Sequence, residues 1–155
     1  EKLVIVTPQF TSMENGYSFI KAAFVRSLKA KSTLLALYEK HGRDIAAFRG
    51  AIENLPVVDV ARQEYESLLT SQKFRMIANM VSEEKDLLIV KQLQKIVKNY
   101  LDVDSHWGGA LEESKEVQSS VNKLTPFVAL NPNSKNSQEL LTLARKIEGE
   151  SKAGG

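Results

Sequence analysis

Apolar residues recur at helical spacings through the first third of the chain. Between residues 12 and 41 they stand three, four or seven positions apart, which places them on one stripe of a helix. His41-Gly42 ends this stretch, because glycine readily takes the left-handed conformation that follows many helices. The pattern predicts one long helix over residues 12–41. Its apolar positions are Tyr17, Ile20, Phe24, Leu28, Leu35 and Tyr38.

A short helix should follow at once. Asp44 is a suitable N-cap, Ile45, Phe48 and Ile52 lie at spacings of three and four, and Asn54-Leu55-Pro56 interrupts the pattern.

Residues 57–124 contain no proline and keep an apolar helical register. The acidic residues Glu83, Glu84 and Asp86 directly after Ser82 suit the positive end of a new helix. We therefore expect either one kinked long helix or two helices that meet near Ser82. The register is carried by Val58, Tyr65, Leu69, Met76, Met80, Ile89, Leu93, Ile96, Val97 and Tyr100.

The last third predicts two more helices. Residues 110–124 form a polar pattern with a thin apolar edge, and Thr125-Pro126 stops it. Beyond a polar loop at residues 131–138, Asn136 and Glu139 resemble a capping pair for a final helix. That helix would direct Leu140, Leu143 and Ile147 inward.

The first residues differ from the rest. Residues 3–6 are a β-like run that Thr7-Pro8 cuts off, and one short strand makes no sheet by itself. We expect an extended arm over residues 1–11, and leave open that it pairs with another strand, including one from a second copy of the chain. The predicted fold is all-α: a single-domain bundle of five or six helices over residues 1–155, with this arm and a frayed tail at 150–155.

The amino-acid composition indicates the general class of protein. The 155 residues are 43% hydrophobic and 26% charged, which is typical of a soluble globular domain. The chain has 21 basic and 19 acidic residues, a balance that does not by itself indicate nucleic acid or an anionic membrane as a partner. No cysteine is present, which excludes disulfides, thiol catalysis and cysteine-bound zinc. Therefore no redox compartment is implied.

Two further features bear on location. The chain begins at Glu1, which we take to favour export, periplasmic or extracellular, over the cytoplasm, without assigning a compartment. Its longest apolar runs, such as residues 87–90, are far shorter than the roughly 20 residues of a transmembrane helix. We expect no membrane-spanning segment.

The stretch YLDVDSHWGG at residues 100–109 carries the most suggestive chemistry. Asp102, Asp104 and His106 alternate as the first ligands of a calcium loop do. However, histidine is a poor ligand for a hard cation, and Trp107 stands where such a loop needs glycine. We expect a turn closed by Gly108-Gly109, with no metal, no cofactor and no catalytic residue assigned.

Other catalytic and anion-binding patterns are weak. The chain has no nucleophile elbow and no phosphate-binding glycine loop. Two basic clusters exist, but the first is spread around its helix, and a nucleic-acid site would need both to meet in space. The first is Lys21, Arg26, Lys29 and Lys31, and the second, on one helix face, is Lys91, Lys95 and Lys98.

These eliminations predict a non-enzymatic helical protein-binding module, such as an adaptor, an assembly factor or a surface-exposed interaction domain. Trp107, with His106 and Tyr100, is the expected partner-binding surface, because tryptophan is enriched among residues that dominate binding energy. Association between copies through residues 3–6 is left open. The alternatives are a nucleic-acid-binding protein that uses its lysine faces and a metal-dependent enzyme centred on Asp102, Asp104 and His106.

Overall fold

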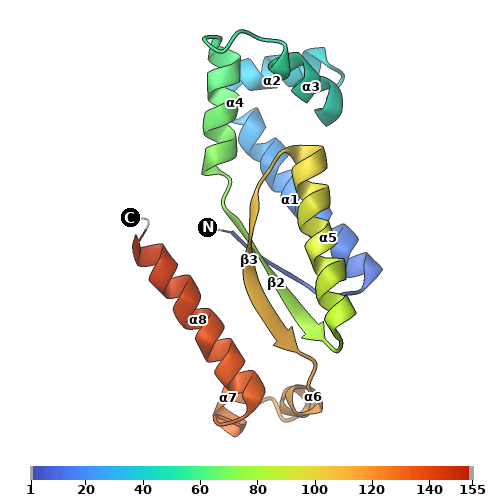
Figure 1. Ribbon diagram of the computed structural model, residues 1–155, viewed down its shortest axis with the longest axis vertical. Coiled ribbons are helices and arrows are strands. Elements are labelled where there is room, and N and C mark those ends of the chain that lie inside the picture. Colours follow the sequence, from blue (N-terminus) through green and yellow to red (C-terminus); the bar gives the residue numbers. More distant parts are fainter. Residues whose placement is uncertain (1, 154–155) are drawn as a thin grey trace.

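The protein is a mixed α/β structure built on a three-stranded parallel sheet (Figure 1). The computed structural model describes residues 2–153, with side chains described through residue 149. The elements in chain order are β1 (Lys2–Val6), α1 (Phe10–Lys29), α2 (Ser32–Lys40), α3 (Ile45–Glu53), α4 (Val60–Ser71), β2 (Phe74–Val81), α5 (Glu84–Leu101), β3 (Ser105–Glu112), α6 (Lys115–Asn122), α7 (Phe127–Leu130) and α8 (Lys135–Ala153).

The predicted all-α bundle is therefore wrong. The N-terminal residues are not a free arm, because β1 pairs with β2 in parallel, from Lys2 opposite Phe74 to Val6 opposite Ala78. The strand order is β1-β2-β3 and all three strands run in the same direction, so their carboxyl ends meet at one edge. Helices α1 to α4 connect β1 to β2, and α5 connects β2 to β3.

Strand β2 lies in the middle of the region predicted to be helical. Its residues from Phe74 to Ala78 are buried on both faces of the sheet, and such a strand reads as a continuous apolar run without alternation. In addition, Met76 and Met80 are four residues apart, a spacing that is also typical of a helix. A short apolar run of this kind does not distinguish a strand from a helix, and only pairing on both edges decides it.

Strand β3 replaces the turn expected at residues 100–109, of which only residues 102–104 form a connection. Gly108 allows β3 to pack closely against β2, because a Cβ atom at position 108 would lie 2.9 Å from both Arg75 Cγ and Ile77 Cγ1. The β2–β3 register shifts between Met76 and Ile77 at this point. The strand was not predicted because residues 105–112 contain two glycines and have low β propensity.

The helices were predicted with mixed success. The expected helix over residues 12–41 is two helices, because Lys31 is extended and starts α2 in a new direction. Asp44 does cap α3, its side chain accepting a hydrogen bond from Ala47 N at 2.8 Å. A new helix does start after Ser82.

The C-terminal helices depart from prediction at their starts. The helix expected over residues 110–124 is only α6, because β3 takes residues up to Glu112. Helix α8 forms as expected, but Ser134 Oγ caps its first turn by accepting from Ser137 N at 3.2 Å, whereas Asn136 donates to Glu112 O instead. The tail expected to fray is helical to Ala153, and residues 154 and 155 lie outside the described residues.

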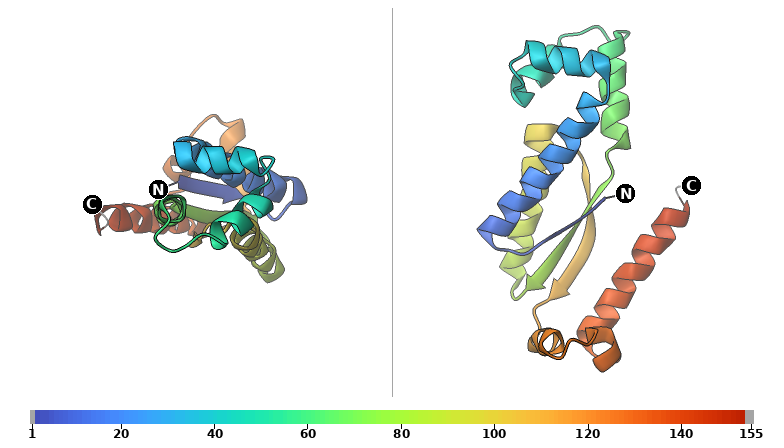
Figure 2. Two further views of the ribbon diagram at one scale, coloured as in Figure 1. Left: turned by 90° about the horizontal axis from the view of Figure 1, so that it is seen from above. Right: turned by 180° about the vertical axis from the view of Figure 1, so that it is seen from behind.

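The elements form layers around the sheet (Figure 2). Helices α1 and α5 pack side by side on the face where Phe74, Met76 and Ala78 join the core. Helix α8 packs on the opposite side of β3, where Leu143 approaches Gly109. Beyond the amino ends of the strands, α2, α3 and α4 form a helical unit around an aromatic cluster. Its edge-to-face ring pairs are Phe24–Tyr65, Tyr38–Phe48 and Phe48–Tyr65, with centroids 5.6 to 6.4 Å apart.

Within residues 2–153, none of the helices combines the length and the apolar character that crossing a bilayer requires.

Replacing Phe48 with alanine should lower the free energy of unfolding by about 3 to 5 kcal/mol, because its fully buried ring contacts two tyrosines. Urea unfolding followed by circular dichroism measures this. Phe19→Ala is the control, since Phe19 is half exposed on α1, and it should change the stability by less than about 1 kcal/mol. Equal losses in the two variants would contradict the aromatic cluster.

Candidate functional site

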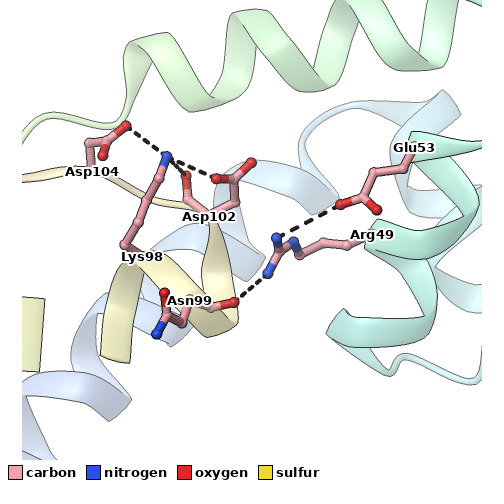
Figure 3. Close-up of polar contacts among 6 residues, drawn as sticks. All are labelled: Arg49, Glu53, Lys98, Asn99, Asp102 and Asp104. Atoms are coloured by element: carbon pink, nitrogen blue, oxygen red, sulfur yellow. Dashed lines mark hydrogen bonds and ion pairs between the residues drawn. The ribbon is translucent and has the colours of Figure 1, made fainter. Parts of the chain in front are cut away.

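The aspartates of the suspected metal site are held by a lysine. Lys98 Nζ lies 2.9 Å from Asp102 Oδ1 and 3.0 Å from Asp104 Oδ2 (Figure 3). These hydrogen bonds raise the pKa of Lys98. Asp102 ends α5 in the left-handed conformation, with φ of 57°. Both carboxylates are therefore paired with Lys98 beside the end of α5. The described residues contain no group of three side chains that could hold a metal ion.

Arg49 ties the helical unit to the same helix end (Figure 3). It reaches from α3 and donates to Asn99 O of α5 at 2.7 Å, which satisfies one of the free carbonyls of the last turn. Tyr65 lies nearby in α4 and is buried. Burial, with a smaller contribution from the Asp102 carboxylate, raises the pKa of Tyr65 to about 12.

The raised pKa of Tyr65 makes stability depend on pH in the alkaline range. Between pH of about 10 and 12, an unfolded chain releases a tyrosine proton that the folded chain keeps, so the free energy of unfolding should fall as pH rises. Urea unfolding at a series of pH values should show this loss in the wild type and less of it in Tyr65→Phe. Tyr100→Phe, at an exposed tyrosine, should keep the full loss. A pH dependence unchanged in Tyr65→Phe would contradict the assignment.

The three expected partner-binding residues lie on different surfaces. Trp107 is half-buried in β3 against the core, and Lys91 Nζ of α5 stands 5.7 Å from its ring centre. His106 precedes it and is exposed, so its side chain points to the opposite face of the sheet. Tyr100 is exposed on α5. The three side chains do not share one surface, and the partner-binding role of all three stays a prediction.

The second lysine cluster does line one groove. Lys91, Lys95 and Lys98 of α5 face the start of β3 around a cavity of about 370 Å³. Lys98 is already paired with two aspartates, which removes much of the positive charge. Helix α1, with the first cluster, packs on the β1 side of the sheet. None of the residues of the first cluster lines this groove, and a nucleic-acid site gains no support.

A largely apolar cavity lies at the carboxyl ends of β2 and β3. We call it the strand-end slot; it has a volume of about 260 Å³. Strands β2 and β3 form its floor, and α6, α7 and the start of α8 form its walls. Ligands of parallel α/β sheets bind at this edge as a rule. The slot is lined by Asn79, Met80, Leu111, Glu112, Glu113, Ser114, Val117, Gln118, Val121, Phe127, Asn136 and Leu140.

The floor of the slot contains an unusual backbone conformation. Met80 has φ of 58°, in the left-handed region that residues with side chains rarely adopt. The β2–β3 register shifts again between Ala78 and Val81. The bulge leaves Val81 buried and leaves Met80 partly exposed in the slot. Strain of this kind is concentrated at functional sites.

A second, more open cavity of about 610 Å³ adjoins the slot and shares Glu112, Glu113 and Gln118 with it. Glu83 and Glu84 also line it, at the start of α5. That helix start is already occupied, because Asp86 Oδ2 accepts from Ser82 N at 2.9 Å and from Glu83 N at 3.1 Å. The surroundings are therefore acidic and oppose an anion at this helix end.

The sequence singled out none of the slot residues for binding, and Met80, Asn136 and Leu140 were assigned only to predicted helices. They come from β2, β3, α6, α7 and the start of α8, and no local spacing connects them. Two of the elements that form the floor were themselves predicted as helix or turn. The only available signal was Asn79, a polar residue within a continuous apolar run.

The chain matches no model of a known protein family and no curated protein sequence.

Proposed function

We propose that the protein binds a flat, largely apolar small molecule with a hydrogen-bonding edge in the strand-end slot. The observation that carries this is the slot itself: apolar walls at the carboxyl ends of two parallel strands, with a few polar groups inside. Its volume of about 260 Å³ suits one or two fused rings. Val117, Val121, Phe127 and Leu140 provide the apolar surface.

The polar groups favour a heteroaromatic ring such as a purine base. The side chains of Asn79 and Gln118 are carboxamides that make no hydrogen bond within the described residues, and each offers a donor beside an acceptor. A carboxamide pairs in this way with the N6 and N7 atoms of adenine. Asn136 uses its Nδ2 on Glu112 O and keeps its carbonyl oxygen for a ligand.

The charges around the slot select against phosphate. Glu113 lines it together with Glu112, which is paired with Lys135, and the start of α5 is filled by its own carboxylates. The part of the ligand that the slot recognises is therefore an uncharged ring.

Adenosine should bind to the wild type with 1:1 stoichiometry in isothermal titration calorimetry. Asn79→Ala should weaken this binding about tenfold or more, because it removes a donor and an acceptor for the ring edge. Inosine, which lacks the N6 amino group, should bind more weakly than adenosine. Asn133→Ala, on an exposed loop residue, is the control and should bind as the wild type does. Absence of saturable adenosine binding would contradict the proposal.

A protein-binding function is the second candidate, and strand β1 favours it. Within the described chain β1 pairs only with β2, so its other edge has unpaired backbone groups. Leu3 and Ile5, on the face away from the core, are 44% and 60% exposed. Parallel sheets are normally covered on both faces. A strand of another protein, laid along β1 with an apolar surface over Leu3 and Ile5, would complete this part of the sheet.

Ile5→Lys should abolish such an interaction, because it places a charge on the apolar face of the edge strand. Pull-down from the native source measures it, with the wild type and the variant run side by side at two salt concentrations. Leu88→Lys, at an exposed leucine of α5, is the matched control and should retain every partner. Partners retained equally by Ile5→Lys would remove the β1 edge from consideration.

A further inference from the structure

The walls of the strand-end slot differ in how firmly they are held. Residues 115–130, which comprise α6 and α7, provide Val117, Gln118, Val121 and Phe127 to the lining. Yet Ser120 is the only buried residue of α6, and α7 has none. Elements with so little buried surface open at low free-energy cost.

Both ends of residues 115–130 are anchored. Before the segment, Glu113 N donates to Val81 O at 3.1 Å and the Glu113 carboxylate accepts from Ser82 Oγ at 2.7 Å. After it, Asn131 O accepts from the fully buried Ser137 at 2.6 Å. Among the described residues, the hydrogen bonds that leave the segment between these anchors reach only Ser114 and Asn131. The segment is thus a strap fixed at two points.

The apolar stripe of this strap is left largely in water. Val117, Val121 and Leu124 follow one another at spacings of four and three and are 37%, 66% and 93% exposed. The first two of these residues line the slot. An amphipathic helix normally buries such a stripe against the body of the protein.

Leu124, between α6 and α7, has φ of 50°, in the left-handed region. A leucine held there is strained, and rotation of its backbone to an ordinary negative φ releases the strain. This residue is a natural point for the strap to bend.

We propose that residues 115–130 form a flap that closes over the strand-end slot when a flat ligand binds, burying Val121 and Leu124 against it. The proposal rests on the proposed function for its ligand. Closure covers the exposed stripe with the ligand and the start of α8, excludes water from the carboxamides, and slows ligand release. The open position is the one described here.

Hydrogen exchange of the free protein tests the flap without any ligand. Although α6 is helical, its amides should exchange at least about tenfold faster than those of α5, which packs on the sheet. Protection of α6 equal to that of α5 would overturn the flap regardless of what binds.

Labelling tests the closure. The chain has no cysteine, so Leu124→Cys gives a single site for an environment-sensitive fluorophore, and Val58→Cys, at an exposed residue of the distant helical unit, gives the control. Adenosine should change the emission of the label at position 124 with the midpoint that calorimetry gives for the same labelled protein, and leave the label at position 58 unchanged. Calorimetric binding without a change at position 124 would overturn the flap while the proposed function stands. Absence of binding by calorimetry would overturn the proposed function and with it this closure.

A third variant separates closure from simple contact. Leu124→Ser keeps the backbone but removes the apolar side chain that closure would bury, so adenosine should bind about tenfold more weakly. The melting temperature should stay unchanged, because Leu124 is exposed in the free protein. Leu88→Ser, at an exposed leucine of α5, should leave both quantities unchanged. Unaltered binding by Leu124→Ser would also overturn the flap.

Discussion

Burial of β2 on both faces is the constraint on which the other elements depend. Phe74, Met76 and Ala78 point into the core beneath α1 and α5, and Ile77 on the other face is buried as well. Both other strands pair with β2 and take their direction from it. Because all three strands are parallel, this one strand also fixes where their carboxyl ends meet. The strand-end slot exists at that edge because β2 and β3 end there side by side.

The two ends of the molecule are built differently. At the amino ends of the strands, α2, α3 and α4 surround aromatic rings that pack edge to face, and Arg49 ties this unit to α5. At the carboxyl ends, α6 and α7 bury almost nothing, and Met80 and Leu124 hold strained backbone conformations. A firmly packed unit at the amino ends and loosely packed helices at the carboxyl ends are typical of a stable scaffold that supports a binding region.

The sequence predicted those elements whose signals are local. Asp44 marked the start of α3, the acids after Ser82 marked the start of α5, and the spacing of Leu140, Leu143 and Ile147 marked α8. The strands could not be predicted in this way. Residues 74–81 are apolar on both sides and residues 105–112 contain two glycines, so each becomes a strand only through its neighbours.

The candidate site was not predicted either, because it too depends on contacts between residues far apart in the sequence. Asp102, Asp104 and His106 attracted interest through their spacing, but spacing does not show that Lys98, one turn earlier on a helix, binds both aspartates. The slot is assembled from side chains up to 61 positions apart, from Asn79 to Leu140. Only a knowledge of the parallel sheet brings them together.

The sparse burial of α6 and α7 has a practical consequence for handling the protein. Gentle heating or a low concentration of denaturant would release these two short helices while the sheet and the aromatic rings still hold. Because both helices are short, far-ultraviolet circular dichroism would hardly register the loss. A preparation that looks fully folded by that signal can therefore have lost a wall of its cavity, and intactness of this region has to be judged by a probe placed within it.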